Sequence, residues 1–254
     1  MHGSPMTNTA IVTGGSRGIG AATARRLAAG GWDVAVSYNT DTEAAASVVA
    51  ECEKLGVRAL AVQADMASED DIVRLFAMVD SELGSFRALV NNAGIVGDAK
   101  ERVDQFTQAR IERTLAINVT GPFLCAREAV RRMSSRFGGS GGVIVNVSSA
   151  ASRLGGPNEY VDYAASKGAI DTMTVGLAKE VADEGIRVNA VRPGLIRTTI
   201  HASGGQPDRV ERLASAIPVQ RAGEPDEVAA AIAWLCSDEA SYITGALLDV
   251  SGGR

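Results

Sequence analysis

The chain has 254 residues and a formal net charge of −5, from 25 Lys and Arg against 30 Asp and Glu. Such an acidic chain lacks the positive surface that nucleic-acid binding requires. No apolar run approaches the roughly 18 residues of a membrane-spanning helix, so no membrane association is predicted. The two His and three Cys are too few for most zinc sites, and no metal is predicted. The length and the 46% hydrophobic share suit one large globular α/β domain.

The cysteines Cys52, Cys125 and Cys236 are odd in number and far apart. They predict no disulfide framework and favour a reducing compartment, here the cytoplasm. Met1–Pro5 lack the pattern of a signal peptide. We interpret them as residues added ahead of a native start at Met6, so that residues 6–254 form the domain.

Short aliphatic runs alternate with longer stretches of helical period along the chain. The predicted strands are Ala10–Thr13, Asp33–Tyr38, Val57–Gln63, Ala88–Asn91, Gly142–Ser148, Arg187–Arg192 and Ala246–Val250. Their nearly continuous apolar character is typical of a parallel sheet that is buried on both faces. The predicted helices are Gly18–Ala29, Asp41–Leu55, Ser68–Leu83, Thr107–Phe137, Asn158–Ala182 and Pro225–Ser237.

The repeated strand–helix order predicts a three-layer, doubly wound Rossmann fold, with a mainly parallel seven-stranded sheet flanked by helices. No linker divides the chain. The irregular segment Leu195–Pro218 follows a predicted strand end, where ligands bind in open α/β sheets. Because irregular loops of this length are usually functional, we predict that it forms a substrate loop.

A glycine-rich turn, Thr13–Gly20, joins the first predicted strand to the first predicted helix. Glycines let the backbone approach a pyrophosphate closely, and the helix start then presents free N–H groups and its positive dipole end. The turn therefore predicts a dinucleotide site that involves Gly14, Ser16, Arg17, Gly18, Ile19 and Gly20.

The second predicted strand ends at Tyr38 and Asn39 without the carboxylate that usually holds the ribose of NAD. Arg17 is suited to a ribose 2′-phosphate instead. These residues favour NADP(H), with Tyr38 and Asn39 beside the cofactor. NAD remains possible, because Asp41 lies just beyond the strand and could reverse the preference.

Tyr163 and Lys167 stand four residues apart on a predicted helix and so share one face. A tyrosine titrates near pH 10 when free, and a nearby cation would stabilise its phenolate. Ser149 ends a predicted strand, where its hydroxyl could bind a substrate oxygen. Taken alone, the Tyr–Lys spacing is common on protein surfaces.

Several motifs occur together in a characteristic order: Thr13–Gly20, Asn91–Gly94, Asn118, Ser149, Tyr163 with Lys167, and Pro193–Gly194. In this combination the chain resembles the short-chain dehydrogenase/reductase family over nearly its whole length. Ile144–Lys167 is similar to a bacterial subgroup described as glucose-1-dehydrogenase-like, and 3-oxoacyl-carrier-protein reductases are also similar.

The resemblance implies a catalytic role for four residues. Tyr163 would be the general acid/base, and Lys167 would lower its pKa and hydrogen-bond the nicotinamide ribose. Ser149 would position the substrate oxygen, and Asn118 would hold a water molecule in a proton relay. The resemblance also implies a homotetramer, and cofactor contacts at Asp65, Met66, Asn91, Ala93, Gly94, Tyr163, Lys167, Pro193, Gly194, Ile196 and Thr198.

The interval from Ser149 to Tyr163 is one residue longer than is usual in the family. We interpret the difference as an insertion within Arg153–Tyr160 that leaves Ser149 in its role. Ser148 is the alternative, but it is expected to point the other way along the strand.

The predicted function is therefore NADP-dependent hydride transfer between nicotinamide and a small carbonyl or alcohol substrate. Within this class, a 3-oxoacyl-carrier-protein reductase and a sugar (glucose) 1-dehydrogenase are alternatives. A non-catalytic dinucleotide sensor is the alternative from another class. The basic stripe Arg127, Arg131, Arg132 and Arg136 is expected to be a solvated face or a subunit contact, and it could also receive an acidic carrier protein. Substrate determinants are expected in Val96–Glu101, Ala150–Tyr160 and Leu195–Pro218.

Overall fold

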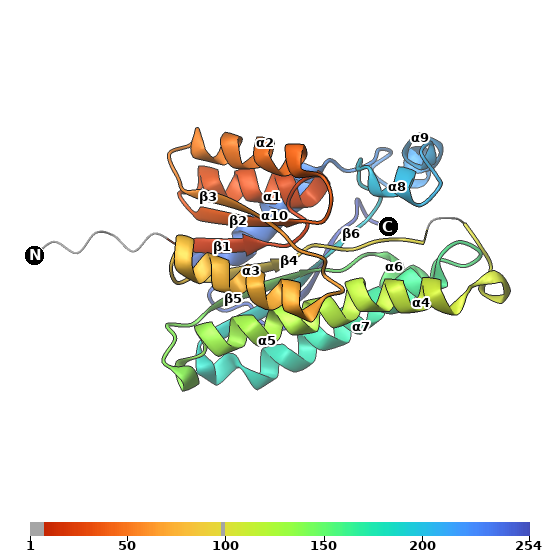
Figure 1. Ribbon diagram of the computed structural model, residues 1–254. Coiled ribbons are helices and arrows are strands. Elements are labelled where there is room, and N and C mark those ends of the chain that lie inside the picture. Colours follow the sequence, from red (N-terminus) through yellow and green to blue (C-terminus); the bar gives the residue numbers. More distant parts are fainter. Residues whose placement is uncertain (1–7, 98–99) are drawn as a thin grey trace, which may run out of the picture.

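The computed structural model describes residues 8–97 and 100–254. The interpretation of Met1–Pro5 and part of the predicted substrate segment Val96–Glu101 lie outside the described residues. Seven parallel strands form one sheet in the order β3-β2-β1-β4-β5-β6-β7 (Figure 1). Their bounds are β1 Thr9–Val12, β2 Asp33–Tyr38, β3 Ala59–Gln63, β4 Ala88–Asn91, β5 Gly142–Val147, β6 Ile186–Pro193 and β7 Leu247–Val250.

Helices cover both faces of this sheet, as Figure 1 shows. Those on one face are α1 (Gly18–Ala29), α2 (Thr42–Glu53) and α10 (Pro225–Cys236), and those on the other are α3 (Glu69–Glu82), α5 (Gly121–Met133) and α7 (Val161–Glu180). Alternate residues of β1 belong to different cores: Val12 packs in the cluster that contains Leu27 of α1, and Ile11 in the cluster that contains Phe76 of α3. The predicted three-layer, doubly wound fold is confirmed.

The helix predicted over Thr107–Phe137 is present as a continuous helical stretch over residues 108–133, but it is not one regular α-helix. The structure has α4 (Gln108–Leu115), a π-helical turn (Ala116–Thr120) and α5, and a 3₁₀ turn (Ser135–Phe137) follows. Pro122, in the first turn of α5, has no N–H to donate to the carbonyl of residue 118, so the regular hydrogen-bond ladder is interrupted there. This interruption lies at Asn118, one of the predicted site residues.

Irregular segments gather at the carboxyl ends of the strands. The loop after β5 contains α6 (Ala151–Leu154), and the predicted substrate loop contains α8 (Ile200–Ser203), α9 (Arg209–Leu213) and a 3₁₀ turn (Ala214–Ala216). Figure 1 shows α8 and α9 at the same end of the sheet as the C-terminus. The remaining 3₁₀ turns are Val103–Gln105, Ala182–Glu184 and Asp238–Ala240.

A buried amide network ties β4 and β5 to α7. Asn91 Nδ2 donates to Asn146 Oδ1 at 2.9 Å, and Asn146 Nδ2 donates to Thr174 Oγ1 at 2.9 Å. We expect Asn146→Ala to lower the free energy of unfolding by about 2–4 kcal/mol, because it leaves polar groups of two neighbours without this partner in the interior. Denaturant unfolding measures this change, and a loss below about 1 kcal/mol would contradict the structural role given to the network.

Candidate active site

A cavity of about 780 Å³ opens at the carboxyl ends of the central strands. It lies where β1 separates β2 from β4, the point at which the strand order reverses. In open α/β sheets this is the position at which ligands bind. Residues from the glycine-rich turn, from the ends of β2 and β4–β6, from α7 and from the substrate loop all line it.

The glycine-rich turn packs closely against the segment that follows β4 and is hydrogen-bonded to it. Gly14 has a φ of +63°, and a Cβ atom there would come within 2.9 Å of Ala93 Cα. Asn92 Nδ2 donates to the carbonyl oxygens of Thr13 and Gly14 at 2.9 and 3.0 Å. A side chain at Gly14 would therefore be strained and would also clash with the opposite turn.

The same turn leaves the start of α1 open to an anion. Arg17 is the N-cap residue of α1, makes no side-chain capping hydrogen bond, and is followed by no acidic residue in the first turn. The N–H groups at this end are thus available together with the positive end of the helix dipole. This cradle fits the pyrophosphate of a dinucleotide.

The end of β2 forms the far wall of the cavity. Tyr38, Asn39 and Asp41 line it together with Arg17. Asp41 Oδ1 accepts a hydrogen bond from Ala44 N at 3.0 Å, so this carboxylate caps α2. Asp65 also lines the cavity, and its Oδ2 accepts from Arg113 Nη2 at 3.0 Å.

Tyr163, Lys167 and Ser149 meet at the opposite wall. Lys167 Nζ donates to the Val147 carbonyl at 2.7 Å and lies 5.7 Å from the centroid of the Tyr163 ring. The Ser149 side chain lies close enough to the Tyr163 phenol to lower its pKa, and both side chains line the cavity. Ser148, in contrast, donates to the Lys167 carbonyl at 3.2 Å. Of the two candidate serines, Ser149 is the one beside Tyr163.

Burial acts in opposite directions on the two titrating groups of this cluster. It raises the pKa of Tyr163, although the Ser149 side chain and the positive charge of Arg209 work against the rise. Burial lowers the pKa of Lys167 to about 8, and Asp171 opposes this fall. Tyr163 is therefore protonated at neutral pH, which suits a proton donor, while the charge of Lys167 is sensitive to mildly alkaline pH.

Asn118 lies directly behind the cavity wall and is fully buried. Its Nδ2 donates to the Ile95 carbonyl at 2.8 Å and to Ser166 Oγ at 3.1 Å, and its Oδ1 accepts from Ile95 N at 2.9 Å. A Cβ atom on Gly94 would lie 3.4 Å from this oxygen and 3.5 Å from Lys167 Nζ. Asn118 is thus close to Lys167, and its role in holding a water molecule stays a prediction.

Most of the predicted site residues line this one cavity. They are Gly14, Ser16, Arg17, Gly18, Ile19, Tyr38, Asn39, Asp65, Met66, Ala93, Gly94, Ser149, Tyr163, Lys167, Pro193, Gly194, Ile196 and Thr198. Gly20, Asn91 and Asn118 do not line it. The Asn91 amide is directed instead into the buried network with Asn146, and Gly20 packs beneath Gly14, where a Cβ atom would lie 2.4 Å from the Gly14 carbonyl oxygen.

The cavity is also lined by Glu159, Tyr160 and Arg209, which were not among the predicted site residues. All three lie within two of the three predicted substrate segments, Ala150–Tyr160 and Leu195–Pro218, but no motif marks them there. Their association depends on how the substrate loop folds back over the start of α7. The only available signal was that Tyr160 precedes Tyr163 by three residues.

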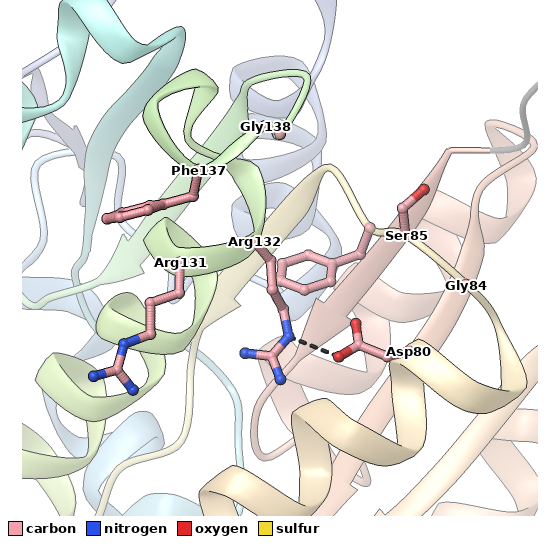
Figure 2. Close-up of a pocket in the computed structure, with 9 residues that line it drawn as sticks. Asp80, Gly84, Ser85, Arg131, Arg132, Phe137 and Gly138 are labelled. Atoms are coloured by element: carbon pink, nitrogen blue, oxygen red, sulfur yellow. Dashed lines mark hydrogen bonds and ion pairs between the residues drawn. The ribbon is translucent and has the colours of Figure 1, made fainter.

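A second, smaller hollow of about 340 Å³ lies between α3 and the end of α5 (Figure 2). Figure 2 shows Arg132 paired with Asp80 across it, at 2.7 Å. The buried Glu128 also pairs with Arg127, Arg131 and Arg132. Much of the basic stripe is therefore neutralised by its own carboxylates, which weakens the expectation that it receives an acidic partner.

Residues 8–97 and 100–254 contain no group of three or more His, Cys, Asp or Glu placed to hold a metal ion. No helix within these same residues combines the length and the apolar character needed to cross a membrane.

Comparison with known sequences shows similarity along nearly the whole chain. Residues 14–254 match a family model described as enoyl-(acyl carrier protein) reductase. An Escherichia coli protein named uncharacterized oxidoreductase YgfF is 57% identical over 96% of this chain and 99% of its own length. Glucose 1-dehydrogenase 2 of Bacillus subtilis is 38% identical over 96% of this chain and 93% of its own.

Solved structures show the same relationship. A short-chain dehydrogenase from Burkholderia cenocepacia, in complex with NADP, matches with a TM-score of 0.87 and 36% identity, over 98% of this chain and 99% of that one. A 3-ketoacyl-(acyl-carrier-protein) reductase from Brucella melitensis, complexed with NADH, matches with a TM-score of 0.90 and 33% identity, over 99% of both chains. The chain belongs to the short-chain dehydrogenase/reductase family of oxidoreductases.

Proposed function

We propose that this protein is an NADP(H)-dependent oxidoreductase that interconverts a carbonyl compound and the corresponding alcohol. The observation that carries the proposal is the cluster of Ser149, Tyr163 and Lys167 in the same cavity as the glycine-rich cradle. The match to a structure that holds NADP adds support. The cytoplasmic location and the homotetramer stay predictions.

The cavity offers a place for each part of the cofactor. The start of α1 would hold the pyrophosphate, and Arg17, Tyr38 and Asn39 would hold the adenosine end. The nicotinamide end would lie towards Tyr163 and Lys167. When bound, the nicotinamide supplies or accepts a hydride at the substrate carbon.

The chain's own residues would provide the proton chemistry. Ser149 and Tyr163 would bind the substrate oxygen, because both line the cavity and the Ser149 side chain lies near the Tyr163 phenol. In the reducing direction Tyr163 donates its phenolic proton to that oxygen, and in the oxidising direction the phenolate takes the proton back. The Lys167 ammonium stabilises the phenolate, because an opposite charge nearby favours the ionised form.

Arg17 is expected to select NADPH over NADH. Asp41 is the residue that could favour NAD. One of its carboxylate oxygens already accepts a hydrogen bond from Ala44 N and so caps the start of α2. We expect NADPH to bind the unmodified protein more tightly than NADH, and Arg17→Ala to weaken NADPH binding about tenfold or more while changing NADH binding little. Titration calorimetry with each coenzyme measures both effects.

Arg26→Ala is the matched control, because Arg26 is an exposed arginine of the same helix that does not line the cavity. It should leave both affinities unchanged. Equal affinities for the two coenzymes in the unmodified protein would refute the preference.

A substrate panel tests the proposed activity. NADPH oxidation should be measured with ketones, aldehydes, sugars and 3-oxoacyl thioesters. Turnover of at least one carbonyl compound is the expected result. Activity with 3-oxoacyl thioesters would favour a 3-oxoacyl-carrier-protein reductase, and activity with sugars would favour a sugar dehydrogenase. Tight NADPH binding without any turnover would favour the non-catalytic sensor and would contradict the proposal.

A further inference from the structure

Arg209 is a buried cation at the wall of the cavity. It is the first residue of α9 in the substrate loop and is only 9% exposed, yet it lines the cavity. Its Cζ atom lies 5.0 Å from the centroid of the Tyr160 ring, which in turn makes an edge contact with the Tyr163 ring at 6.0 Å. A single aromatic ring therefore separates this guanidinium from the phenol that would transfer the proton.

Among the described residues, hydrogen-bond and ion-pair partners contact only the Nη1 group of this guanidinium. Arg209 Nη1 lies 2.7 Å from Glu159 Oε2 and donates to Gln206 Oε1 at 3.1 Å. Nε and Nη2 make no hydrogen bond to any residue in the described ranges. Neither atom is one of the fully buried side-chain nitrogens and oxygens that lack a hydrogen-bond partner. Both groups are therefore without a protein partner in the described ranges, at a residue that lines the cavity.

The geometry of the two unused groups matches a particular ligand. The Nε–H and Nη2–H bonds of a guanidinium run parallel along one edge, and this edge binds both oxygens of a carboxylate at once. Glu159 does not cancel the local positive charge, because it also faces Lys100 Nζ at 3.6 Å. The cavity lining also includes the apolar side chains of Leu154, Pro157, Leu195, Ile200 and Leu213.

We propose that Arg209 forms a carboxylate-binding subsite, so that the substrate carries a carboxylate away from the carbonyl or alcohol that reacts. This inference rests on the proposed function and names its substrate class as keto acids and hydroxy acids. In a mostly apolar pocket, a few convergent polar groups set the orientation of the ligand. Arg209 would hold one end of the substrate while Ser149 and Tyr163 bind the other.

The first test compares straight-chain keto acids of increasing length with their methyl esters, in the unmodified protein and in Arg209→Gln. The unmodified protein should prefer at least one acid to its ester in kcat/KM. Arg209→Gln should lower kcat/KM for that acid about tenfold to a hundredfold and change it little for the ester. Equal losses for acid and ester would overturn the proposal, because a purely structural role, or the effect of Arg209 on Tyr163, acts on both alike.

Arg212→Gln is the matched control. Arg212 lies in the same helix and also donates to Gln206 Oε1, at 2.9 Å, but it does not line the cavity. This variant should keep the preference for the acid. Loss of the preference in both variants would place the effect in the loop as a whole and would contradict a subsite at Arg209.

A binding measurement separates this inference from the proposed function. Calorimetry with hexanoate and with hexanamide, in the presence of NADP, requires no turnover. Hexanoate should bind the unmodified protein more tightly than hexanamide, and Arg209→Gln should remove the difference. If no carbonyl compound is turned over but this difference is found, the proposed activity fails and the subsite stands. If the difference is absent, the subsite fails whatever the activity.

Discussion

Tyr163→Phe should lower the rate of carbonyl reduction by about 10²–10⁴-fold, the usual contribution of a general acid. The substitution removes only the phenolic oxygen, and with it the proton that would be donated to the substrate oxygen. Because the ring is retained, the packing at the cavity wall and the affinity for NADPH should change little. Steady-state kinetics with any active carbonyl substrate and a coenzyme titration give the two readouts.

Tyr160 provides the sharpest comparison, because it is a second tyrosine in the same cavity. Its phenol oxygen accepts a hydrogen bond from Gln206 Nε2 at 3.4 Å, and burial raises its pKa to about 12. Tyr163, not Tyr160, is the tyrosine whose ring lies 5.7 Å from Lys167 Nζ, so Tyr160→Phe should cost less than about tenfold in rate. The exposed Tyr242 gives a second control, for which Tyr242→Phe should be without effect. Near-normal turnover by Tyr163→Phe would overturn the assignment.

Lys167→Met should abolish most of the activity without unfolding the protein. The ammonium is buried, and the fall of its pKa from 10.5 to about 8 shows that the interior disfavours the charge. This shift corresponds to about 3 kcal/mol. Methionine removes that cost and loses the hydrogen bond to Val147, which contributes about 1–3 kcal/mol. We expect a loss in rate of at least about 10²-fold, with a free energy of unfolding at pH 7 that is unchanged or higher.

The pH dependence of stability gives an independent check on Lys167. Between pH 8 and 10.5 the unfolded chain still binds this proton while the native protein has released it. The contribution of Lys167 to stability therefore rises with pH across this window, and below it the cost of the buried charge is fully present. The stability advantage of Lys167→Met should shrink across the same window in denaturant titrations. If the difference in unfolding free energy between Lys167→Met and the unmodified protein did not change with pH, a lowered pKa of the buried Lys167 would be contradicted.

The sequence was sufficient for the fold because its central strands β1, β4 and β5 are almost entirely buried. Runs such as Ala88–Asn91 and Gly142–Ser148 show no polar alternation, and both faces of these strands are covered in the structure. Most residues that line the cavity near the glycine-rich turn and Tyr163 were also predictable, because the turn and the Tyr–Lys spacing depend on local geometry. The interrupted helix at Asn118 was not predicted, since helical periodicity continues through Pro122.

The substrate end of the cavity could not be predicted from local patterns. Arg209 and Glu159 are 50 residues apart and meet only because α9 folds over the start of α7. Neither residue belongs to a motif. The loop that carries Arg209 has no hydrophobic periodicity from which the direction of its side chains could be predicted. Asn91 differs from these residues because it does belong to a motif. The motif implies a contact with the cofactor, but in the structure the Asn91 amide hydrogen-bonds Asn146 in the interior.

The central claim is that this cavity transfers a hydride between nicotinamide and a substrate carbon while Tyr163 handles the proton. The most direct measurement is reduction of an active carbonyl substrate with NADPH that is deuterated at the transferring position of nicotinamide C4, followed by mass spectrometry of the alcohol. The account predicts one deuterium bound to the carbinol carbon, and a much slower formation of the same product by Tyr163→Phe. An alcohol without deuterium, or equal rates for the two proteins, would contradict it.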